Sequence, residues 1–194
     1  MSQKDLMRDK SILDIGGKKK NKRGLFDIGL HSQDVKYINI DLSTNPDIVS
    51  DATKIPLPAR SADVIIMGEI LEHVPEPLKV LKEGYRLLKP GGYIIATVPF
   101  MYPVHADPED FGRYTDYYWK DAAMKLGFSD IVIERQGGMF AILALAVQHF
   151  FRAKGKTWGP IQNPLVNFLM WLDKHTQAPL LLDWTTGYGL VFRK

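Results

Sequence analysis

A short apolar segment that ends in two glycines constrains this chain more than any other part of it. Residues 11–17 read SILDIGG, in which Asp14 interrupts the apolar run and Gly16 and Gly17 close it. A buried parallel strand ends in this way where the next loop must let a ligand approach the backbone. Glycine suits that loop because it adopts positive φ angles and has no Cβ to block a nucleotide-like ligand.

A second apolar segment, KYINID at residues 36–41, ends in another acid, Asp41. A glycine loop after one strand and an acid at the end of the next is the arrangement that holds a ribose-bearing cofactor. Two glycines are fewer than the three of the dinucleotide fingerprint. These two segments therefore predict a cofactor with a ribose, and later segments must identify it.

The composition is that of one ordinary globular domain, with 194 residues, 45% hydrophobic and 24% charged. Cysteine is absent, which excludes disulfides, thiolate metal sites and a cysteine nucleophile, and permits a cytoplasmic location. The first ten residues lack the apolar core of a secretory signal. A net charge of +3 does not demand nucleic acid as a partner. We expect a single cytoplasmic domain over residues 1–194.

Apolar runs alternate with helical patterns over the first two thirds of the chain, which predicts a doubly wound α/β fold. The expected strands are residues 11–15, 37–40, 47–49, 62–67, 93–98, 128–134 and, beside the sheet at the end of the chain, 188–192. The expected helices are a couple of turns in residues 25–30, then 77–88, which a Lys-Pro-Gly-Gly turn stops, and 117–126.

Residues 137–183 do not follow this alternation and form an apolar insertion before the last strand. Two blocks, 139–151 and 165–172, have helical character and are separated by a polar stretch. Each block is shorter than the roughly 20 residues that span a bilayer. One interpretation is a lid helix packed on the sheet, and the other is an interfacial segment that gives residues 139–172 a peripheral membrane contact.

Five segments in this order resemble the class I S-adenosylmethionine-dependent methyltransferases, and within them the type 11 methyltransferase family. The segments are ILDIGG, NIDLS, DATKIPLPARSADVII, GEILEHVPEP and LLKPGGYIIATVP, and they cover about residues 11–135. The resemblance implies a mostly parallel, seven-stranded, Rossmann-like sheet. It also implies an enzyme that uses S-adenosylmethionine as its cofactor.

The resemblance implies a role for each cofactor-binding residue along the carboxyl ends of the strands. Asp14 with the Gly16-Gly17 loop would lie against the methionine part of the cofactor. Asp41, followed by Leu42, would accept hydrogen bonds from the two ribose hydroxyls, since an ionised carboxylate only accepts.

The adenine and the reacting sulfonium are implied to lie beside two further pairs of residues. Asp51 and Ala52 would lie by the adenine, and Gly68 and Glu69 would border the sulfonium and the incoming acceptor. Structural alternatives exist for Asp14, which can bond nearby amides, and for Asp51, which can cap a loop or helix. Glu72 and His73, in the segment LEHVP, would either orient their loop or touch the substrate.

The chain departs from the family pattern directly after the glycine loop. Where many members place a third glycine and a long helix, residues 18–23 read KKKNKR. A shortened helix gives the carboxylate of the cofactor less of a helix N-terminus to bind. Two alternatives follow from this segment: a non-catalytic, cofactor-binding partner protein, and an RNA methyltransferase that uses the basic loop.

A polar and aromatic loop, PFMYPVHADPEDFGRYT, follows Pro99 and should lie over the transferable methyl group. His105 is the candidate general base, because an imidazole titrates near neutrality. Asp107 or Asp110 would orient it or bind a sugar hydroxyl, and Arg113 would pair with an anionic group. The alternative is an internally bonded loop with an Asp110–Arg113 ion pair.

Similar loops recur in type 11 members encoded with bacterial glycan and cell-envelope genes, which favours a sugar or glycolipid hydroxyl as the acceptor. Methyl transfer to a hydroxyl oxygen also requires removal of a proton, which agrees with a nearby base. No tight set of metal ligands stands out, so we expect no metal site, although His105 with Asp107 keeps one open. The sequence thus predicts a methyltransferase for a small-molecule or glycan-like acceptor.

Overall fold

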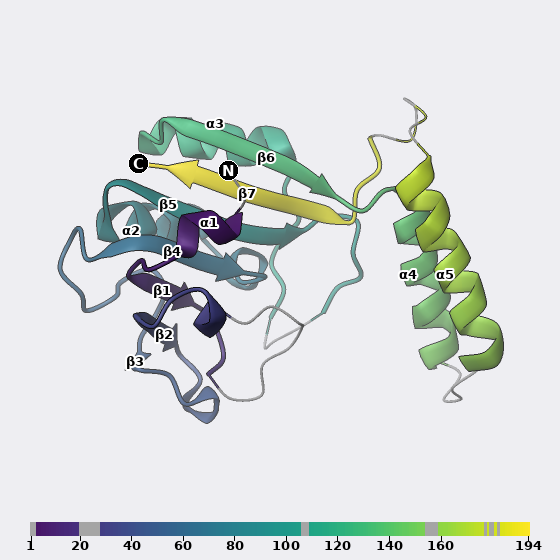
Figure 1. Cartoon of the computed structure of the whole chain (residues 1–194), viewed down its shortest axis with the longest axis horizontal. Helices are drawn as coiled ribbons and strands as arrows, with labels where there is room; N and C mark the ends of the chain where they lie inside the picture. Colours follow the sequence, from purple (N-terminus) through teal and green to yellow (C-terminus); the bar gives the residue numbers. More distant parts are fainter. Residues whose placement is uncertain are drawn as a thin grey trace. The chain divides into compact units, whose positions relative to one another are not determined.

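The computed structural model describes residues 3–19, 28–105, 109–153, 159–176, 178, 181 and 183–194. In this described part, the strands form one seven-stranded sheet in the order β3-β2-β1-β4-β5-β7-β6 (Figure 1). The strands are β1 (Ile12–Ile15), β2 (Val35–Asn39), β3 (Ile48–Val49), β4 (Ala62–Gly68), β5 (Leu88–Pro99), β6 (Asp130–Gln136) and β7 (Gly187–Arg193). The predicted mostly parallel, seven-stranded α/β fold is confirmed.

Strand β1 lies at the centre of the parallel part of the sheet. Ile12 is paired with Val35 on β2 and with Val64 on β4, and both pairings are parallel. The chain winds from β1 outward to β3 and then returns to place β4 on the other side of β1. Ligands bind in open α/β sheets at such a reversal of strand order, beyond the carboxyl ends of the strands.

The last strand, β7, runs antiparallel to β5. Near the start of β5 the Gly91 N–H donates to Lys194 O (2.9 Å), whereas the Phe100 N–H just after β5 donates to Thr186 O (2.7 Å). The prediction of a terminal strand beside the sheet is therefore confirmed, and β7 lies within the sheet, between β5 and β6.

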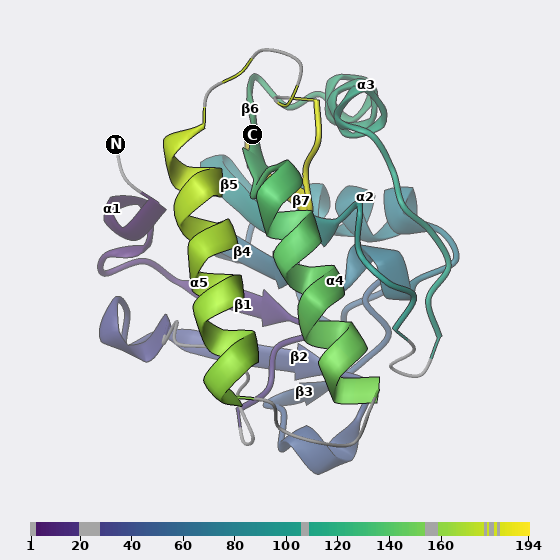
Figure 2. The same cartoon turned by 90° about the vertical axis from the view of Figure 1, so that its right-hand side faces the viewer.

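Helices cover both faces of the sheet, as the doubly wound prediction requires. Helix α1 (Gln3–Met7) lies on one face, while α2 (Pro77–Leu87) and α3 (Asp116–Leu126) lie on the other (Figures 1 and 2). Alternate residues of β4 serve the two faces. Val64 packs with Met7 of α1, and Met67 faces α2, where a Cβ on Gly84 would lie 2.9 Å from its methyl carbon.

Several boundaries differ from the prediction. Strand β5 begins at Leu88, before the predicted residue 93, because Lys-Pro-Gly-Gly forms an irregularity within the strand and does not delay its start. Helix α5 (Gly159–His175) begins six residues before the predicted block and contains Pro164. Of the predicted residues 25–30, the structure describes only the 3₁₀ turn η1 (Ile28–Leu30), and residues 25–27 lie outside the described part.

The chain divides into two compact units. The first comprises residues 1–98, 105–133 and 189–194, and the second comprises residues 99–104 and 134–188. The second unit contains the predicted insertion as two packed helices, α4 (Met139–Ala153) and α5. The Asp173 carboxylate, on α5, accepts hydrogen bonds from the N–H groups of Gly138 (2.9 Å) and Ala141 (2.9 Å), and so caps the N-terminus of α4.

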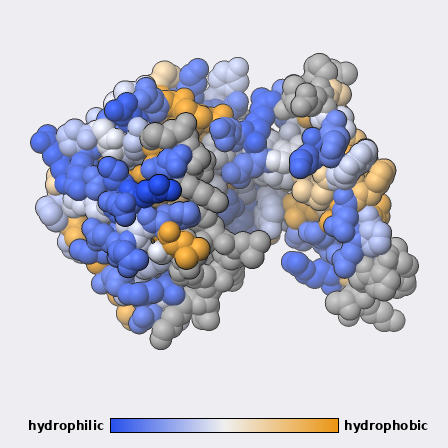
Figure 3. Space-filling model, in the orientation of Figure 1, coloured by the Kyte–Doolittle hydropathy of each residue, from blue (hydrophilic) through white to orange (hydrophobic). Residues whose placement is uncertain are grey.

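The α4–α5 hairpin exposes large apolar side chains. Phe150, Phe168 and Trp171 are each more than half exposed, and apolar residues show on the hairpin in Figure 3. Among the described residues, no helix has the length and apolar character needed to cross a membrane. The lid and the interfacial segment therefore both remain predictions for residues 137–183.

Candidate functional site

The loop after β1 has the backbone that its two glycines predict. Gly16 has a φ of +81°, and its N–H donates to Ile38 O on β2 (2.8 Å). Gly17 packs directly on Asp14, since a Cβ at this position would lie 2.0 Å from the Oδ2 atom of the buried Asp14 carboxylate. Both glycines are thus required by local geometry, one for its φ angle and one for its lack of a side chain.

Asn39 joins this loop to the end of β2, a role that the sequence analysis did not assign. Its Nδ2 donates to Gly16 O (3.0 Å) and to Gly17 O (3.1 Å), while its Oδ1 accepts from the Asp41 N–H (2.9 Å). An amide can do this because it both donates and accepts. One side chain therefore fixes the glycine loop relative to the predicted ribose-binding acid.

Asp41 lies exposed just beyond β2 and caps the 3₁₀ turn η2 (Leu42–Thr44). Its carboxylate accepts from the Ser43 hydroxyl (2.8 Å) and from the Ser43 N–H (2.8 Å), and these hydrogen bonds lower the pKa of Asp41. Leu42 beside it is 74% exposed, so an acid and an apolar side chain are presented together. Each carboxylate oxygen keeps a second lone pair for a hydroxyl donor.

Asp51 follows β3 and, as the structural alternative anticipated, makes a local turn. It accepts from the Thr53 N–H (2.7 Å) and the Thr53 hydroxyl (2.8 Å), which lower the pKa of Asp51. Next to it, Ala52 is half-buried. The carboxylate itself is exposed at the same edge of the sheet as Asp41.

The loop that carries Asp51 is tied to helix α2 by an ion pair that the sequence did not reveal. Glu83 accepts from the Ile55 N–H (2.7 Å), and Arg86 donates to Glu83 (2.7 Å) and to the carbonyl of Leu57 (2.9 Å). The Arg86 side chain is 38% exposed and that of Glu83 is 10% exposed, so this partly buried pair holds the loop through its hydrogen bonds to the backbone.

Gly68 and Glu69, at the end of β4, lie exposed at the same edge. Glu69 has a φ of +50°, which is uncommon for a residue with a side chain, and its N–H donates to Thr97 O on β5 (3.1 Å). Such backbone conformations cluster at functional sites. The next residue, Ile70, packs against Gly16, where a Cβ would lie 2.6 Å from the Ile70 Cδ1.

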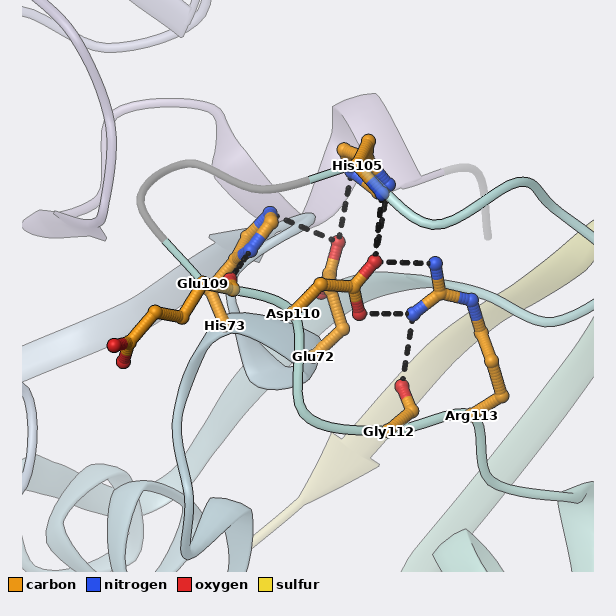
Figure 4. A network of polar contacts seen from close by, with 7 residues as sticks. All are labelled: Glu72, His73, His105, Glu109, Asp110, Gly112 and Arg113. Atoms are coloured by element: carbon orange, nitrogen blue, oxygen red, sulfur yellow. Dashed lines mark hydrogen bonds and ion pairs between the residues drawn. The ribbon is translucent and has the colours of Figure 1, made fainter.

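The turn after Glu69 and the polar loop after β5 form a second group, which we call the Glu72–His105 cluster: Glu72, His73, His105, Asp110 and Arg113. Figure 4 shows the Glu72 carboxylate between the two imidazoles. Its Oε1 lies 3.6 Å from His73 Nε2 and 3.8 Å from His105 Nε2. The sequence left Glu72 and His73 either to orient their loop or to touch the substrate, because their proximity to His105, 32 positions beyond His73, arises only from the fold.

Glu72 is the most buried acid of the cluster, with a side chain that is only 1% exposed. The pKa of Glu72 is raised to about 7, mainly by burial and to a lesser extent by the charge of Glu69, although its own backbone N–H, His73 and Arg113 act to lower it. Within the described part of the chain, neither of its carboxylate oxygens accepts a hydrogen bond. Burying a carboxylate without a hydrogen-bond donor lowers the stability of the fold. Glu72 is therefore a candidate for a functional role.

Asp110 and Arg113 form the bidentate ion pair that the structural alternative described. Arg113 donates to both carboxylate oxygens of Asp110, at 2.5 and 2.7 Å, and these bonds hold the pKa of Asp110 well below its usual range. Asp110 also accepts from the His105 N–H (2.9 Å) and lies 3.5 Å from His105 Nδ1. Arg113 therefore positions Asp110, and Asp110 faces the imidazole of His105.

Some predicted residues lie outside the described part: Asp107 and the basic residues 20–23. Of the basic segment, Lys19 is described, and its Nζ lies 2.6 Å from Asp47 Oδ1. Thus this lysine pairs with an acid that precedes β3. The predicted cofactor-binding residues, in contrast, are all described, and they lie in the last residues of β1 and β4 or in the loops that follow β1, β2, β3 and β4.

We predict that Gly17→Ala destabilises the protein while Gly68→Ala does not. The new Cβ at residue 17 would overlap the Asp14 carboxylate, whereas at residue 68 the nearest atom is Thr97 Oγ1 at 4.0 Å. Overpacking a fixed site costs about 1–3 kcal/mol. Urea denaturation of both variants measures the difference, and equal unfolding free energies would show that Asp14 moves away without cost.

Comparisons with known proteins agree with this geometry. A family model described as a methyltransferase domain matches residues 20–96. A demethylmenaquinone methyltransferase of Listeria monocytogenes is 39% identical over 59 residues, which are 30% of this chain and 25% of that protein. A malonyl-[acyl-carrier protein] O-methyltransferase of Marinomonas sp. is 38% identical over 48 residues, or 25% and 18% of the two chains. The matched stretches thus span about a quarter or less of these relatives.

The fold is shared with solved methyltransferase structures. A phosphoethanolamine N-methyltransferase 2 of Haemonchus contortus, in complex with S-adenosylhomocysteine, has a TM-score of 0.60 and 17% identity over 96% of this chain and 49% of that chain. S-adenosylmethionine is the cofactor of the matched family. Over residues 20–96 the chain is therefore similar to a methyltransferase family, and it shares its fold with solved S-adenosylmethionine-dependent methyltransferases.

Proposed function

We propose that this protein transfers a methyl group from S-adenosylmethionine to an oxygen of a small-molecule or glycan-like acceptor. One observation carries the proposal: Ile70 packs against the glycine loop, and two residues later Glu72 enters the Glu72–His105 cluster. A surface suited to a ribose-bearing cofactor and a group of proton-accepting side chains are therefore adjacent along a single turn. Methyl transfer to a hydroxyl needs this adjacency.

The cofactor half of the site has the chemistry that S-adenosylmethionine requires, and when bound the cofactor supplies a methyl group on a sulfonium. Asp41 would accept hydrogen bonds from ribose hydroxyls, and the exposed Leu42 would contact the adenosine. Asp51 with Ala52 would lie by the adenine. Asp14 and the backbone of the Gly16-Gly17 loop would hold the methionine part.

The acceptor half would be the Glu72–His105 cluster, with Gly68 and Glu69 at its border. When no metal ion is bound to the cluster, the Nε2 lone pair of His105 would take the proton of the acceptor hydroxyl. Asp110 would orient the ring through its contact with Nδ1. Arg113 would act through Asp110. Bound S-adenosylmethionine would supply the methyl group to the acceptor oxygen, and His105 would hold the proton that the acceptor loses.

The relatives and the polar loop both bear on the identity of the acceptor. The relatives named above are methyltransferases of demethylmenaquinone and of malonyl-[acyl-carrier protein], and the second is an O-methyltransferase. The polar loop that supplies His105 favours a hydroxylated, glycan-like acceptor, because its acidic and imidazole groups hydrogen-bond hydroxyls.

The cofactor assignment predicts that Asp41→Ala weakens S-adenosylmethionine binding at least tenfold, since each lost hydrogen bond to a charged group is worth about 1.5–3 kcal/mol. Isothermal titration calorimetry with S-adenosylmethionine and S-adenosylhomocysteine measures this. The matched control is Asp34→Ala, which removes an exposed acid just before β2, at the opposite end of the same strand. Parent-like binding by Asp41→Ala would contradict the ribose assignment, and no heat from the parent protein would refute the proposed function.

The acceptor assignment predicts that the parent transfers tritiated methyl groups from S-adenosylmethionine to small-molecule or lipid fractions of a cell extract. His105→Ala should abolish transfer and keep cofactor binding, because His105 lies outside the cofactor residues. His31→Ala, an imidazole that precedes β2, serves as the control. Label in RNA instead would establish the RNA methyltransferase. Cofactor binding without any transfer would establish a non-catalytic partner protein.

A lipid-linked acceptor would be reached at a membrane surface, and the exposed apolar side chains of the α4–α5 hairpin are suited to that contact. We expect the protein to float with anionic liposomes in a density gradient. Replacing Phe168 and Trp171 by serine should reduce the floated fraction severalfold, because these side chains are about half exposed. If the protein stays at the bottom of the gradient, the membrane contact is refuted and a water-soluble acceptor is favoured.

A further inference from the structure

Three potential metal ligands converge in the Glu72–His105 cluster. One carboxylate oxygen of Glu72 and one ring nitrogen each of His73 and His105 lie within 4.8 Å of one another. The two imidazoles meet edge to face, with ring centroids 5.0 Å apart, so they are not stacked on each other. Tetrahedral ligands at about 2.1 Å from a cation lie about 3.4 Å apart. The two spacings from Glu72, 3.6 and 3.8 Å, need to contract by only a few tenths of an ångström, while the two ring nitrogens lie within 4.8 Å of each other and would have to approach further.

Both imidazoles direct the same nitrogen toward Glu72. His73 Nδ1 lies 2.5 Å from Glu109 O, and His105 Nδ1 lies 3.5 Å from the Asp110 carboxylate (Figure 4). A ring nitrogen beside an oxygen acceptor carries the proton, which leaves the other nitrogen, Nε2, with a lone pair. Metal-binding histidines are oriented in this way, with the outer N–H on a carboxylate or a backbone carbonyl.

Glu72 supplies the independent evidence that the cluster binds a ligand. Its side chain is only 1% exposed. No donor among the described residues forms a hydrogen bond with its oxygens. An ionised carboxylate in such a position is strongly disfavoured unless a positive charge compensates it. A divalent cation between Glu72 and the two imidazoles would provide that charge.

The backbone around the cluster is already fixed. The Phe111 N–H donates to Glu72 O (2.8 Å), so the polar loop is fastened to the 3₁₀ turn η3 (Leu71–His73) that carries two of the three ligands. Arg113 in turn holds Asp110 against His105. The ligands therefore come from a rigid turn and from a loop attached to it, and little ordering would remain to be done on binding.

We propose that Glu72, His73 and His105 bind one first-row divalent transition cation, for which Zn²⁺ is the probe. Two imidazoles and one carboxylate suit zinc, iron or manganese, whereas magnesium and calcium prefer a shell of oxygens. Three protein ligands leave a coordination position open, as in catalytic metal sites. The sequence did not predict this site, because its third ligand is 32 residues from the second.

The inference rests on the proposed function in one respect only: an acceptor oxygen would occupy the open coordination position of the cation. With a cation bound, the Nε2 lone pair of His105 is a metal ligand and no longer the base of the metal-free cluster. Cation binding itself requires neither S-adenosylmethionine nor an acceptor. The two proposals can therefore fail separately.

Equilibrium dialysis against micromolar Zn²⁺ tests the proposal. The full chain is used without a tag, after metal has been removed with a chelator, and the number of Zn²⁺ ions bound per chain is measured. We expect one Zn²⁺ per chain and a rise in the thermal midpoint on loading, because a ligand that binds the folded state stabilises it. Glu72→Gln and His73→Ala should each weaken binding by at least about tenfold. Asp110→Asn should weaken it by about 10-fold through the orientation of His105.

The controls separate a built site from other outcomes. His31→Ala should bind zinc like the parent, and circular dichroism shows which variants are folded. The isosteric Glu72→Gln guards against loss of the fold as an explanation, because it preserves the shape of the side chain, and the partly exposed His73→Ala provides a second ligand variant. No saturable zinc, or equal zinc in the parent and both ligand variants, would overturn the proposal. S-adenosylmethionine calorimetry on the stripped protein reports on the proposed function independently.

Discussion

The parallel pairing of β1 with β2 on one side and β4 on the other is the constraint on which the site depends. Because Ile12 pairs with both Val35 and Val64, the carboxyl ends of the three strands lie at one edge. The glycine loop, Asp41 and Glu69 follow those ends directly. A slip of one residue in either pairing would turn every side chain of that strand to the opposite face and displace the residue that follows it.

Much of the fold could be predicted because its signals are local. Apolar runs such as ADVIIM at residues 62–67 give strands, and the proline and glycines after α2 end that helix. The cofactor residues could be proposed for the same reason, since each lies at or just after the end of a predicted strand. The predicted start of β5 was wrong because one segment plays two roles. The Lys-Pro-Gly-Gly segment ends α2 and also lies within β5.

Only part of the Glu72–His105 cluster could be predicted, because its members come from two segments that only the folded chain brings together. The polar loop indicated His105, Asp110 and Arg113, whereas nothing in the sequence showed that Glu72 and His73 lie beside them. Their convergence requires β4 and β5 to be adjacent and the Phe111 N–H to bond Glu72 O. Asn39 escaped notice similarly, since a strand-end amide gives no sign of which backbone carbonyls it will bond.

The cap that Asp173 provides to α4 gives the hairpin a property that neither helix has alone. The Asp173 carboxylate in the last turn of α5 accepts the hydrogen bonds of the first turn of α4. The two ends of the insertion are therefore bonded to each other. Fraying of α5 would release the α4 N-terminus as well, and the two helices should open and close together as one cooperative unit. The stability of each helix in the hairpin is therefore set by the other helix as well as by its own sequence.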